Sequence, residues 1–363
     1  MNSVISRRLS ILPPLLTMLL LPMPGYAEEA GNAARKDLPV GQTTEGTKAG
    51  EGNTAGEEDK GEAKCRKLDV GAAAEKNGRR KMPLLTSDEP NMLGWTRDAY
   101  EKQGFMDFTL SMRYPLFFEA MCEGYRYNML PFISFTGRMG QYFDRHSAPV
   151  VTKRFNPKLF FRFYEPSHSE DKQLWSDDNG LDYFDIGYAH ESNGQTVDSP
   201  ALFAAAVASY GSPEIAQDYV SRGWDYLGYK RHLQMHEHDL ESLDAEARYF
   251  LLHGLLQSTS EEYSTWEGPR SITHISQVDG LRLKLNFGFH RDWFKGASLQ
   301  LMTGYRDLGK HPTLRTELGF TPLSDLLGVP IVLWGQTGYL NNIAQYYRRT
   351  WAVGIAASFE TFE

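Results

Sequence analysis

The sequence is poor in cysteine and has no excess of basic residues. Of its 363 residues only Cys65 and Cys122 are cysteines, which allows one disulfide or two free thiols, and no function is expected to depend on them. The formal net charge is -8 at pH 7, and lysine and arginine form no basic stripe that could neutralise phosphates. The composition therefore argues against nucleic acid as a partner.

Long apolar runs are also missing, apart from one at the start of the chain. Arg7 and Arg8 precede an apolar stretch over about 9–21, and small residues around Ala27 suit a cleavage site. This pattern predicts a secretory signal peptide over residues 1–27, too short and wrongly flanked for a spanning helix. Its removal would take away two positive charges, so the net charge would become -8 - 2 = -10.

Aromatic residues are nearly absent from residues 28–81, which are rich in Gly, Ala, Glu and Lys. Such a segment cannot bury enough apolar surface to offset its ordering entropy, so we predict a disordered low-complexity tail. Residues 82–363 have a high aromatic content and are long enough for one domain. No segment in them reaches the apolar length of a transmembrane helix.

What the chain does contain, from residue 82 onward, is alternating sequence. In the clearest case Leu281, Leu283 and Leu285 alternate with Arg282 and Lys284, which sends apolar side chains to one face and polar ones to the other. We predict about twelve strands: Asn91–Asp98, Gly104–Pro115, Gly124–Arg138, Arg154–Tyr164, Asp182–Ser192, Trp224–Gln234, Ala247–Leu256, Gln277–His290, Ser298–Arg306, Thr313–Thr321, Pro330–Leu340 and Arg348–Phe359.

An even number of such strands is typical of a closed transmembrane barrel, in which apolar residues face lipid and polar residues face the lumen. We therefore predict an all-β fold, a transmembrane antiparallel β-barrel over residues 82–363. A secreted, soluble β-sandwich or lipocalin-like barrel would produce similar alternation and stays open as an alternative. The long connection Thr196–Val220 contains Ala201–Tyr210, which could be a short helix or an ordinary surface excursion.

One strand combines a possible base with a possible nucleophile. His190 and Ser192 share the apolar face of the predicted strand with Ile186 and Tyr188. A serine hydroxyl becomes a useful nucleophile when a base removes its proton, and the turn at Asn193-Gly194 could point backbone N–H groups at an oxyanion. No Gly-x-Ser-x-Gly elbow is present. A His-x-Ser pair alone is weak support for catalysis, because most such pairs are ordinary polar residues.

The block His190-Glu191-Ser192-Asn193-Gly194 resembles the His-x-Ser-Asn-Gly signature of the bacterial outer membrane phospholipase A family. Downstream, Ser221-Arg222-Gly223-Trp224-Asp225 is similar to the Ser-Arg-Ser-Trp-Asn block of that family. The similarity extends over most of residues 91–362. This resemblance implies a twelve-stranded barrel that hydrolyses phospholipid acyl esters, requires calcium and acts as a homodimer.

Carried over by position, the resemblance makes His190 the general base and Ser192 the nucleophile, and it gives the N–H of Gly194 to the oxyanion hole. Asp225 takes the place of the asparagine that orients the histidine in the family; an aspartate accepts the same imidazole N–H. The calcium ligands would be the Ser221 hydroxyl and the Gln195 carbonyl. A further serine comes from the partner subunit and falls on Ala148, with Ser147 adjacent. Gln141 matches a glutamine of the dimer interface.

The resulting expectation is a calcium-dependent serine esterase in the outer membrane of a Gram-negative bacterium. It would act on membrane phospholipids as a phospholipase A1/A2 and lysophospholipase, releasing lysophospholipid and fatty acid. The alternative is a catalytically impaired barrel of the same family that serves as a scaffold or narrow pore, which the changes at Asp225 and Ala148 favour. A soluble secreted esterase is a third hypothesis.

Overall fold

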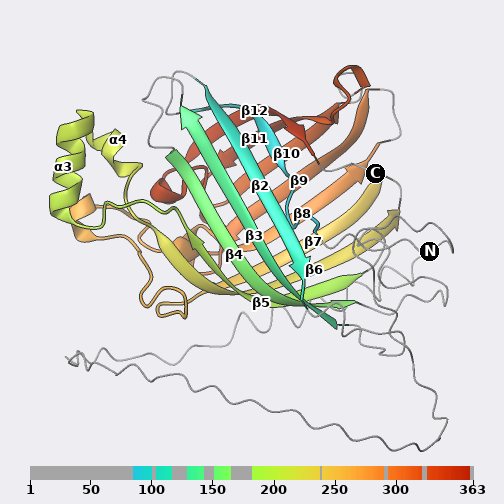
Figure 1. Ribbon diagram of the computed structural model, residues 1–363, viewed down its shortest axis with the longest axis horizontal. Coiled ribbons are helices and arrows are strands. Elements are labelled where there is room, and N and C mark those ends of the chain that lie inside the picture. Colours follow the sequence, from blue (N-terminus) through green and yellow to red (C-terminus); the bar gives the residue numbers. More distant parts are fainter. Residues whose placement is uncertain are drawn as a thin grey trace, which may run out of the picture. The chain divides into compact units, whose positions relative to one another are not determined.

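The computed structural model describes residues 85–99, 104–116, 129–142, 151–164, 182–237, 239–289, 293–320 and 325–359. These residues form a closed barrel of twelve antiparallel strands, in which each strand pairs with its neighbours in sequence and β12 pairs with β1 (Figure 1). The strands are β1 (Met92–Asp98), β2 (Phe105–Pro115), β3 (Met129–Tyr142), β4 (Val151–Tyr164), β5 (Tyr183–Ser192), β6 (Gly223–Glu237), β7 (Leu240–Phe250), β8 (Gly280–Gly288), β9 (Phe294–Gly304), β10 (Thr313–Phe320), β11 (Ile331–Gly338) and β12 (Thr350–Ser358).

The predicted fold class is confirmed: the domain is an antiparallel barrel of twelve strands. No helix in the described part of the chain is long and apolar enough to cross a membrane. The predicted signal peptide over residues 1–27 and the predicted tail over 28–81 lie outside the described residues.

Alternation along each strand divides the wall into an apolar outer face and a charged inner face. On β8, Leu283 is exposed on the outside, while Arg282 and Lys284 line the lumen. The same division holds on β5 and β6, where Ile186 and Leu227 are half exposed. An apolar outer face around a polar lumen is the arrangement of a barrel surrounded by hydrocarbon.

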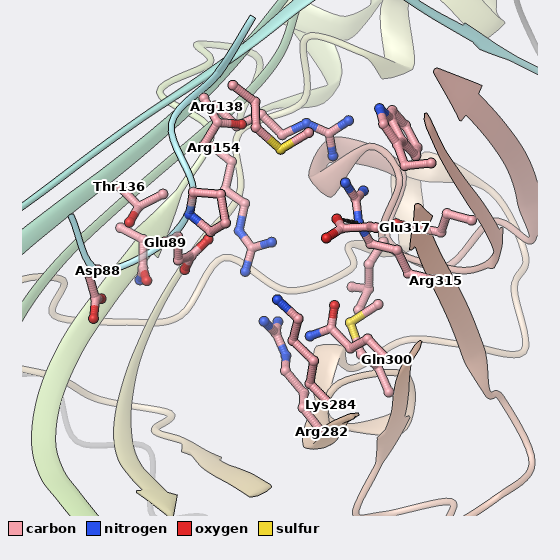
Figure 2. A pocket seen from close by; sticks show the side chains of 18 of the residues that line it. Asp88, Glu89, Thr136, Arg138, Arg154, Arg282, Lys284, Gln300, Arg315 and Glu317 are labelled. Carbon is pink, nitrogen blue, oxygen red and sulfur yellow. Dashed lines mark hydrogen bonds and ion pairs between the residues drawn. The ribbon is translucent and has the colours of Figure 1, made fainter. Parts of the chain in front are cut away.

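The lumen contains a cavity of about 260 Å³ lined by basic and acidic side chains (Figure 2). Several of the basic ones form ion pairs; for example, the guanidinium of Arg138 binds both carboxylate oxygens of Asp107 at 3.1 and 2.6 Å. Inside the same wall, the buried guanidinium of Arg162 binds both carboxylate oxygens of Asp185 at 2.8 and 2.9 Å. Glu191 accepts from Arg154 at 2.7 Å and from Arg248 at 3.0 Å. Charges that face inward are therefore paired with one another.

A short segment before β1 enters this lumen. Thr86 pairs with Arg113 of β2 through backbone hydrogen bonds of 3.0 and 2.6 Å. Lys158 Nζ forms ion pairs with Asp88 Oδ2 at 2.9 Å and with Glu89 Oε1 at 3.4 Å. The segment thus adds two carboxylates to the cavity lining, and Figure 2 shows both among the lining residues.

One end of the barrel is closed by packed loops. A buried apolar cluster on the lumen side joins Trp224 and Tyr226 of β6 to Ile275 and Tyr346 of the loops. Nearby, the buried guanidinium of Arg222 binds Glu267 and the Ala344 carbonyl. The loops contain the short 3-10 helices η2 (Thr265–Glu267), η3 (Ile275–Gln277) and η4 (Ile343–Gln345). These contacts fix the connections that surround the end of β5.

Two helices follow β5 at this same end, α3 (Pro200–Tyr210) and α4 (Pro213–Gln217) (Figure 1). Of the two alternatives left open for Ala201–Tyr210, a short helix or an ordinary surface excursion, the structure has the helix. Proline at the first helical position and Gly211 in the left-handed conformation after the last one explain its limits. Ala206 of α3 and Ala216 of α4 belong to a buried apolar cluster that also contains Phe105 and Tyr142 of the barrel wall.

The predicted boundaries of the seventh strand are wrong. The predicted range was Ala247–Leu256, which left residues 235–246 as a connection, whereas β7 spans Leu240–Phe250. Ser242, Asp244 and Glu246 alternate into the lumen, where charged side chains are satisfied, so a polar strand resembles a loop in sequence. The third strand also reaches Tyr142 rather than Arg138, and the sixth reaches Glu237 rather than Gln234.

Candidate active site

The register of β5 and β6 places His190 directly opposite Asp225. The side chains share the outer face of the barrel, and the imidazole Nδ1 lies 2.8 Å from the Asp225 Oδ1. Because the carboxylate can only accept, the ring nitrogen donates this hydrogen bond and Nε2 remains available as a proton acceptor. The predicted contact between these two residues is present, on the outside of the wall and not in the pore.

The second oxygen of Asp225 is held by three other donors. Oδ2 accepts from the hydroxyl of Tyr188 and from the backbone N–H groups of Leu256 at 2.9 Å and Gln257 at 3.0 Å. Only 1% of the Asp225 side chain is exposed, so its charge is compensated by hydrogen bonds rather than by water. A Cβ on Gly254 would lie 1.8 Å from Oδ2, so glycine is required where the chain crosses the carboxylate.

The backbone of His190 is also fixed from the lumen side. Asn156 of β4 is buried and donates its side-chain N–H to the His190 carbonyl at 2.8 Å. The hydroxyl of Tyr226 in turn donates to the Asn156 oxygen at 3.1 Å. The imidazole remains partly accessible, with 17% of the side chain exposed. Hydrogen bonds from buried Tyr226 and Asn156 on the lumen side therefore hold the backbone of His190, whose imidazole is accessible on the outer face.

Ser192 lies on the same outer face two residues beyond His190, between Phe155 of β4 and Gly223 of β6. In the described structure its hydroxyl makes no hydrogen bond to the imidazole. The strand register places the two residues on one face of β5, and the pairing of the hydroxyl with the base stays a prediction.

The turn after Ser192 has the geometry of a donor site. Gly194 has a φ of +57°, which glycine adopts at little cost, and its N–H has no acceptor among the described residues. The turn is held by Asn193, whose buried side chain donates to the Val220 carbonyl at 2.7 Å and accepts from the Arg222 N–H at 2.9 Å. A free N–H beside Ser192 can stabilise a developing oxyanion.

The two predicted calcium ligands of this chain lie on adjacent segments. The N–H of Ser221 donates to the Val197 carbonyl at 2.8 Å, and the Asn193 N–H donates to the Arg222 carbonyl at 3.1 Å, so Gln195 runs beside Ser221. The Ser221 hydroxyl also donates to Glu261 Oε2 at 2.5 Å. The side-chain Nε2 of Gln195 is buried without a partner in the described structure.

These groups fit a hard cation. A hydroxyl, a backbone carbonyl and a carboxylate are the oxygen donors that Ca²⁺ prefers. No group of three His, Cys, Asp or Glu side chains occurs among the residues described, so a cation here would depend on mixed oxygen ligands. Glu261 is absent from the sequence-based prediction, because a single glutamate in a long loop carries no local signal.

The remaining predicted residues lie elsewhere. Gln141 is on β3 opposite Met106 and shares the outer face with the half-exposed Ile133. Its amide therefore faces outward, as a role in contact with another barrel requires. Ser147 and Ala148 fall outside the described residues.

Comparisons with known proteins agree with this arrangement at the level of the fold. A scan of protein-family models finds no match, and neither does a search of curated proteins. Among solved structures, an active-site mutant of outer membrane phospholipase A from Escherichia coli matches with a TM-score of 0.52 and 15% identity. The outer membrane phospholipase dimer of Salmonella typhi with bound calcium matches with a TM-score of 0.51 and 16% identity. Each match covers 77% of this chain and 93% of the other.

Proposed function

We propose that this protein is a serine hydrolase of the outer membrane of a Gram-negative bacterium that cleaves acyl ester bonds of phospholipids. Its activity would be that of a phospholipase A1/A2 and lysophospholipase, which releases fatty acid and lysophospholipid. The observation that carries the proposal is the imidazole–carboxylate pair of His190 and Asp225 beside Ser192, on the apolar outer face of the barrel. A base and an acid are costly on a face that meets hydrocarbon, and a reaction on lipid accounts for them.

The position of the pair along the wall agrees with a lipid substrate. The pair lies near the end of the barrel where the longest connections gather, and long loops of such barrels face the outside of the cell. An ester at the boundary between acyl chains and headgroups of the outer leaflet would reach Ser192 from the side. The substrate would therefore enter from the membrane and not through the lumen.

The reaction would proceed through an acyl-enzyme. His190 Nε2 takes the proton of Ser192 as the hydroxyl oxygen attacks the ester carbonyl, and Asp225 stabilises the imidazolium. The N–H of Gly194 donates to the oxyanion. As the intermediate collapses, the alkoxide of the lysophospholipid leaves with the proton from His190. Water, deprotonated by His190, then attacks the acyl-serine, which releases the fatty acid and returns the proton to Ser192.

Calcium would be held by the Ser221 hydroxyl, the Gln195 carbonyl and the Glu261 carboxylate. A bound cation supplies positive charge near the developing oxyanion. Glu261 is held in place because its N–H donates to the Gly223 carbonyl at 2.9 Å, directly beside the end of β6. A single chain would therefore offer calcium the Glu261 carboxylate in addition to the Ser221 hydroxyl and the Gln195 carbonyl.

A homodimer would add to this site. The outward amide of Gln141 is suited to pair with its symmetry mate, since an amide facing hydrocarbon gains by finding a partner. Ser147 would then supply a further oxygen to the calcium site of the neighbouring subunit. Such an enzyme would be silent as a monomer and active when lipids in the outer leaflet bring two barrels together.

The test is release of fatty acid from phosphatidylcholine vesicles by the purified full chain, with and without a calcium chelator. Ser192→Ala should reduce turnover by about 10⁶-fold, as loss of a serine nucleophile does in other hydrolases. Ser242→Ala, which changes a buried serine on the lumen side of β7, is the matched control and should leave turnover unchanged. Turnover that survives Ser192→Ala would exclude the proposed nucleophile. A wild-type chain without turnover would favour the impaired scaffold or pore.

A further inference from the structure

The loop that follows β7 presents leucine side chains away from the protein. We call residues 251–257 the leucine loop; in it Leu252, Leu255 and Leu256 are exposed to 60%, 86% and 64%. Residues 251–260 contain no Asp, Glu, Lys or Arg. Large apolar side chains that are grouped and exposed mark a surface that contacts another apolar body.

The leucine loop continues the apolar outer wall of the barrel. It follows Tyr249, which is exposed on β7 and lies opposite Leu227 of β6. Ile186 of β5, opposite Tyr229 on the same outer face, extends this surface toward His190. Because these exposed side chains share the outer face and lead along β7 into the loop, a body that surrounds the strands would also reach the leucines. For a barrel in a membrane, that body is hydrocarbon.

The same loop holds the carboxylate of the candidate active site. The N–H groups of Leu256 and Gln257 donate to Asp225 Oδ2, and the N–H of Leu255 donates to the Tyr188 hydroxyl. The turn is closed by a hydrogen bond of 3.0 Å from the Gly254 N–H to the Gln257 carbonyl. Side chains that face outward and amides that face Asp225 thus belong to one turn and move together.

We propose that the leucine loop is a lipid sensor: its leucines insert into the acyl-chain region of the outer leaflet, and this insertion keeps the turn closed on Asp225. In water, exposed leucines favour loop conformations that bury them, and such conformations release the amides from the carboxylate. In hydrocarbon that bias disappears. The link to hydrolysis rests on the proposed function, whereas the lipid contact does not.

The lipid contact is tested by measuring whether a fluorophore on the leucine loop reaches the acyl-chain region of the membrane. In a Cys65→Ser/Cys122→Ser background, Leu255→Cys is labelled with a fluorophore and reconstituted in phosphatidylcholine vesicles whose acyl chains carry bromine. The matched control is Leu308→Cys, which is exposed to 65% at the same end of the barrel, in a turn with the Asp307–Lys310 ion pair. Bromine should quench the label at 255 and leave the label at 308 unquenched.

Three results would overturn the lipid contact. The first is equal quenching at both positions, and the second is a label at 255 that bromine does not reach. A label that becomes shielded only as the protein density in the vesicle rises would assign the leucines to a second copy of the chain, and it would also overturn the proposal.

The coupling is tested by Leu255→Ser/Leu256→Ser, with Leu308→Ser as the control. The double variant should release fatty acid from vesicles about tenfold more slowly, because misplacing a reacting group by about 1 Å costs up to about 10²-fold. The backbone amides of 256 and 257 should exchange with deuterium faster than in the wild type, whereas the control should match the wild type in both readouts. Unchanged exchange and unchanged rate would overturn the coupling. If the wild type itself releases no fatty acid, the proposed function fails, while quenching and exchange still decide the role of the loop.

Discussion

The inner and outer faces of the barrel wall satisfy their charges in different ways, although the same strands build both. On β5, Asp185 and Glu191 face the lumen and His190 faces outward. The inward carboxylates contact arginines from other strands: Asp185 contacts Arg162 of β4, and Glu191 contacts Arg154 of β4 and Arg248 of β7. The outward Asp225 instead depends on one imidazole, one hydroxyl and two backbone N–H groups.

The two faces differ in whether a carboxylate has alternative partners or depends on each contact. In the lumen, Glu191 keeps one arginine when its contact with the other is lost. On the outer face each group orients the next, from the loop amides to Asp225 and from Asp225 to His190. A chain of groups that each orient the next is expected where precise geometry determines the rate of a reaction. A network of ion pairs is expected where only charge must be balanced.

The difference between the two faces can be tested most directly with adjacent residues of β5, His190 and Glu191. His190→Gln should lower phospholipid hydrolysis by about 10⁴-fold or more, since removing a catalytic base leaves only binding and oxyanion stabilisation. Glu191→Gln changes the adjacent side chain, which faces the lumen, and should leave the rate within about threefold because it does not touch the outer face and Arg248 keeps its ion pair with Glu246. Similar losses for both variants in a fatty-acid release assay would refute the division between the faces.

The second prediction concerns the two oxygens of Asp225. Asp225→Ala should cost about 10³-fold in turnover, because it removes the group that fixes the imidazole tautomer. Asp225→Asn keeps one acceptor, which can serve His190 or the loop amides but not both, so we expect an intermediate loss of about 10-fold to 10²-fold. A steady-state rate series over the three chains checks the order. An asparagine variant as slow as the alanine variant would show that both oxygens are essential.

A smaller effect is expected at Glu261. Glu261→Gln removes one negative charge from the oxygen donors around Ser221 and should raise the calcium concentration for half-maximal binding about tenfold. Titration calorimetry with calcium alone measures this without substrate. Glu214→Gln on the exposed surface of α4 is the control. Equal calcium affinity in the two variants would remove Glu261 from the site.

The smallest effect on hydrolysis should come from the lumen pair of Arg162 and Asp185. Arg162→Met leaves a buried carboxylate uncompensated and should lower the free energy of unfolding by about 3–5 kcal/mol. The double variant Arg162→Met/Asp185→Leu should recover most of that loss, and both variants should hydrolyse lipid at the wild-type rate. Urea unfolding in lipid vesicles and the release assay measure the two quantities. A loss of rate at constant stability would link the lumen to the reaction.

Much of the barrel could be predicted from local sequence, because alternation reports the two faces directly. Arg282 and Lys284 face the lumen and Leu283 faces outward, as the pattern predicted. The same logic failed at the seventh strand. There the charged lumen face of β7 suggested a loop, and the apolar run Leu251–Leu256 suggested a strand. An apolar run that is exposed in a loop therefore has the same local sequence pattern as an apolar strand.

The candidate site was predictable in part for a similar reason. The shared face of His190 and Ser192 follows from the period of a strand, and the opposition of Asp225 to His190 was reached through a resemblance. The contacts of Tyr188 and Glu261 depend on how a distant loop folds back, which no local pattern encodes. The same holds for the backbone amides of the leucine loop.

The two carboxylates that enter the lumen ahead of β1 have an electrical consequence. The cavity lining contains eight basic side chains and six acidic ones, of which Asp88 and Glu89 belong to this segment. Withdrawal of the segment would leave eight cations facing four carboxylates and would detach the counter-ion of Lys158. The cavity would then attract anions more strongly than cations. The affinity of the lumen for a small anion would therefore report the position of a peptide segment.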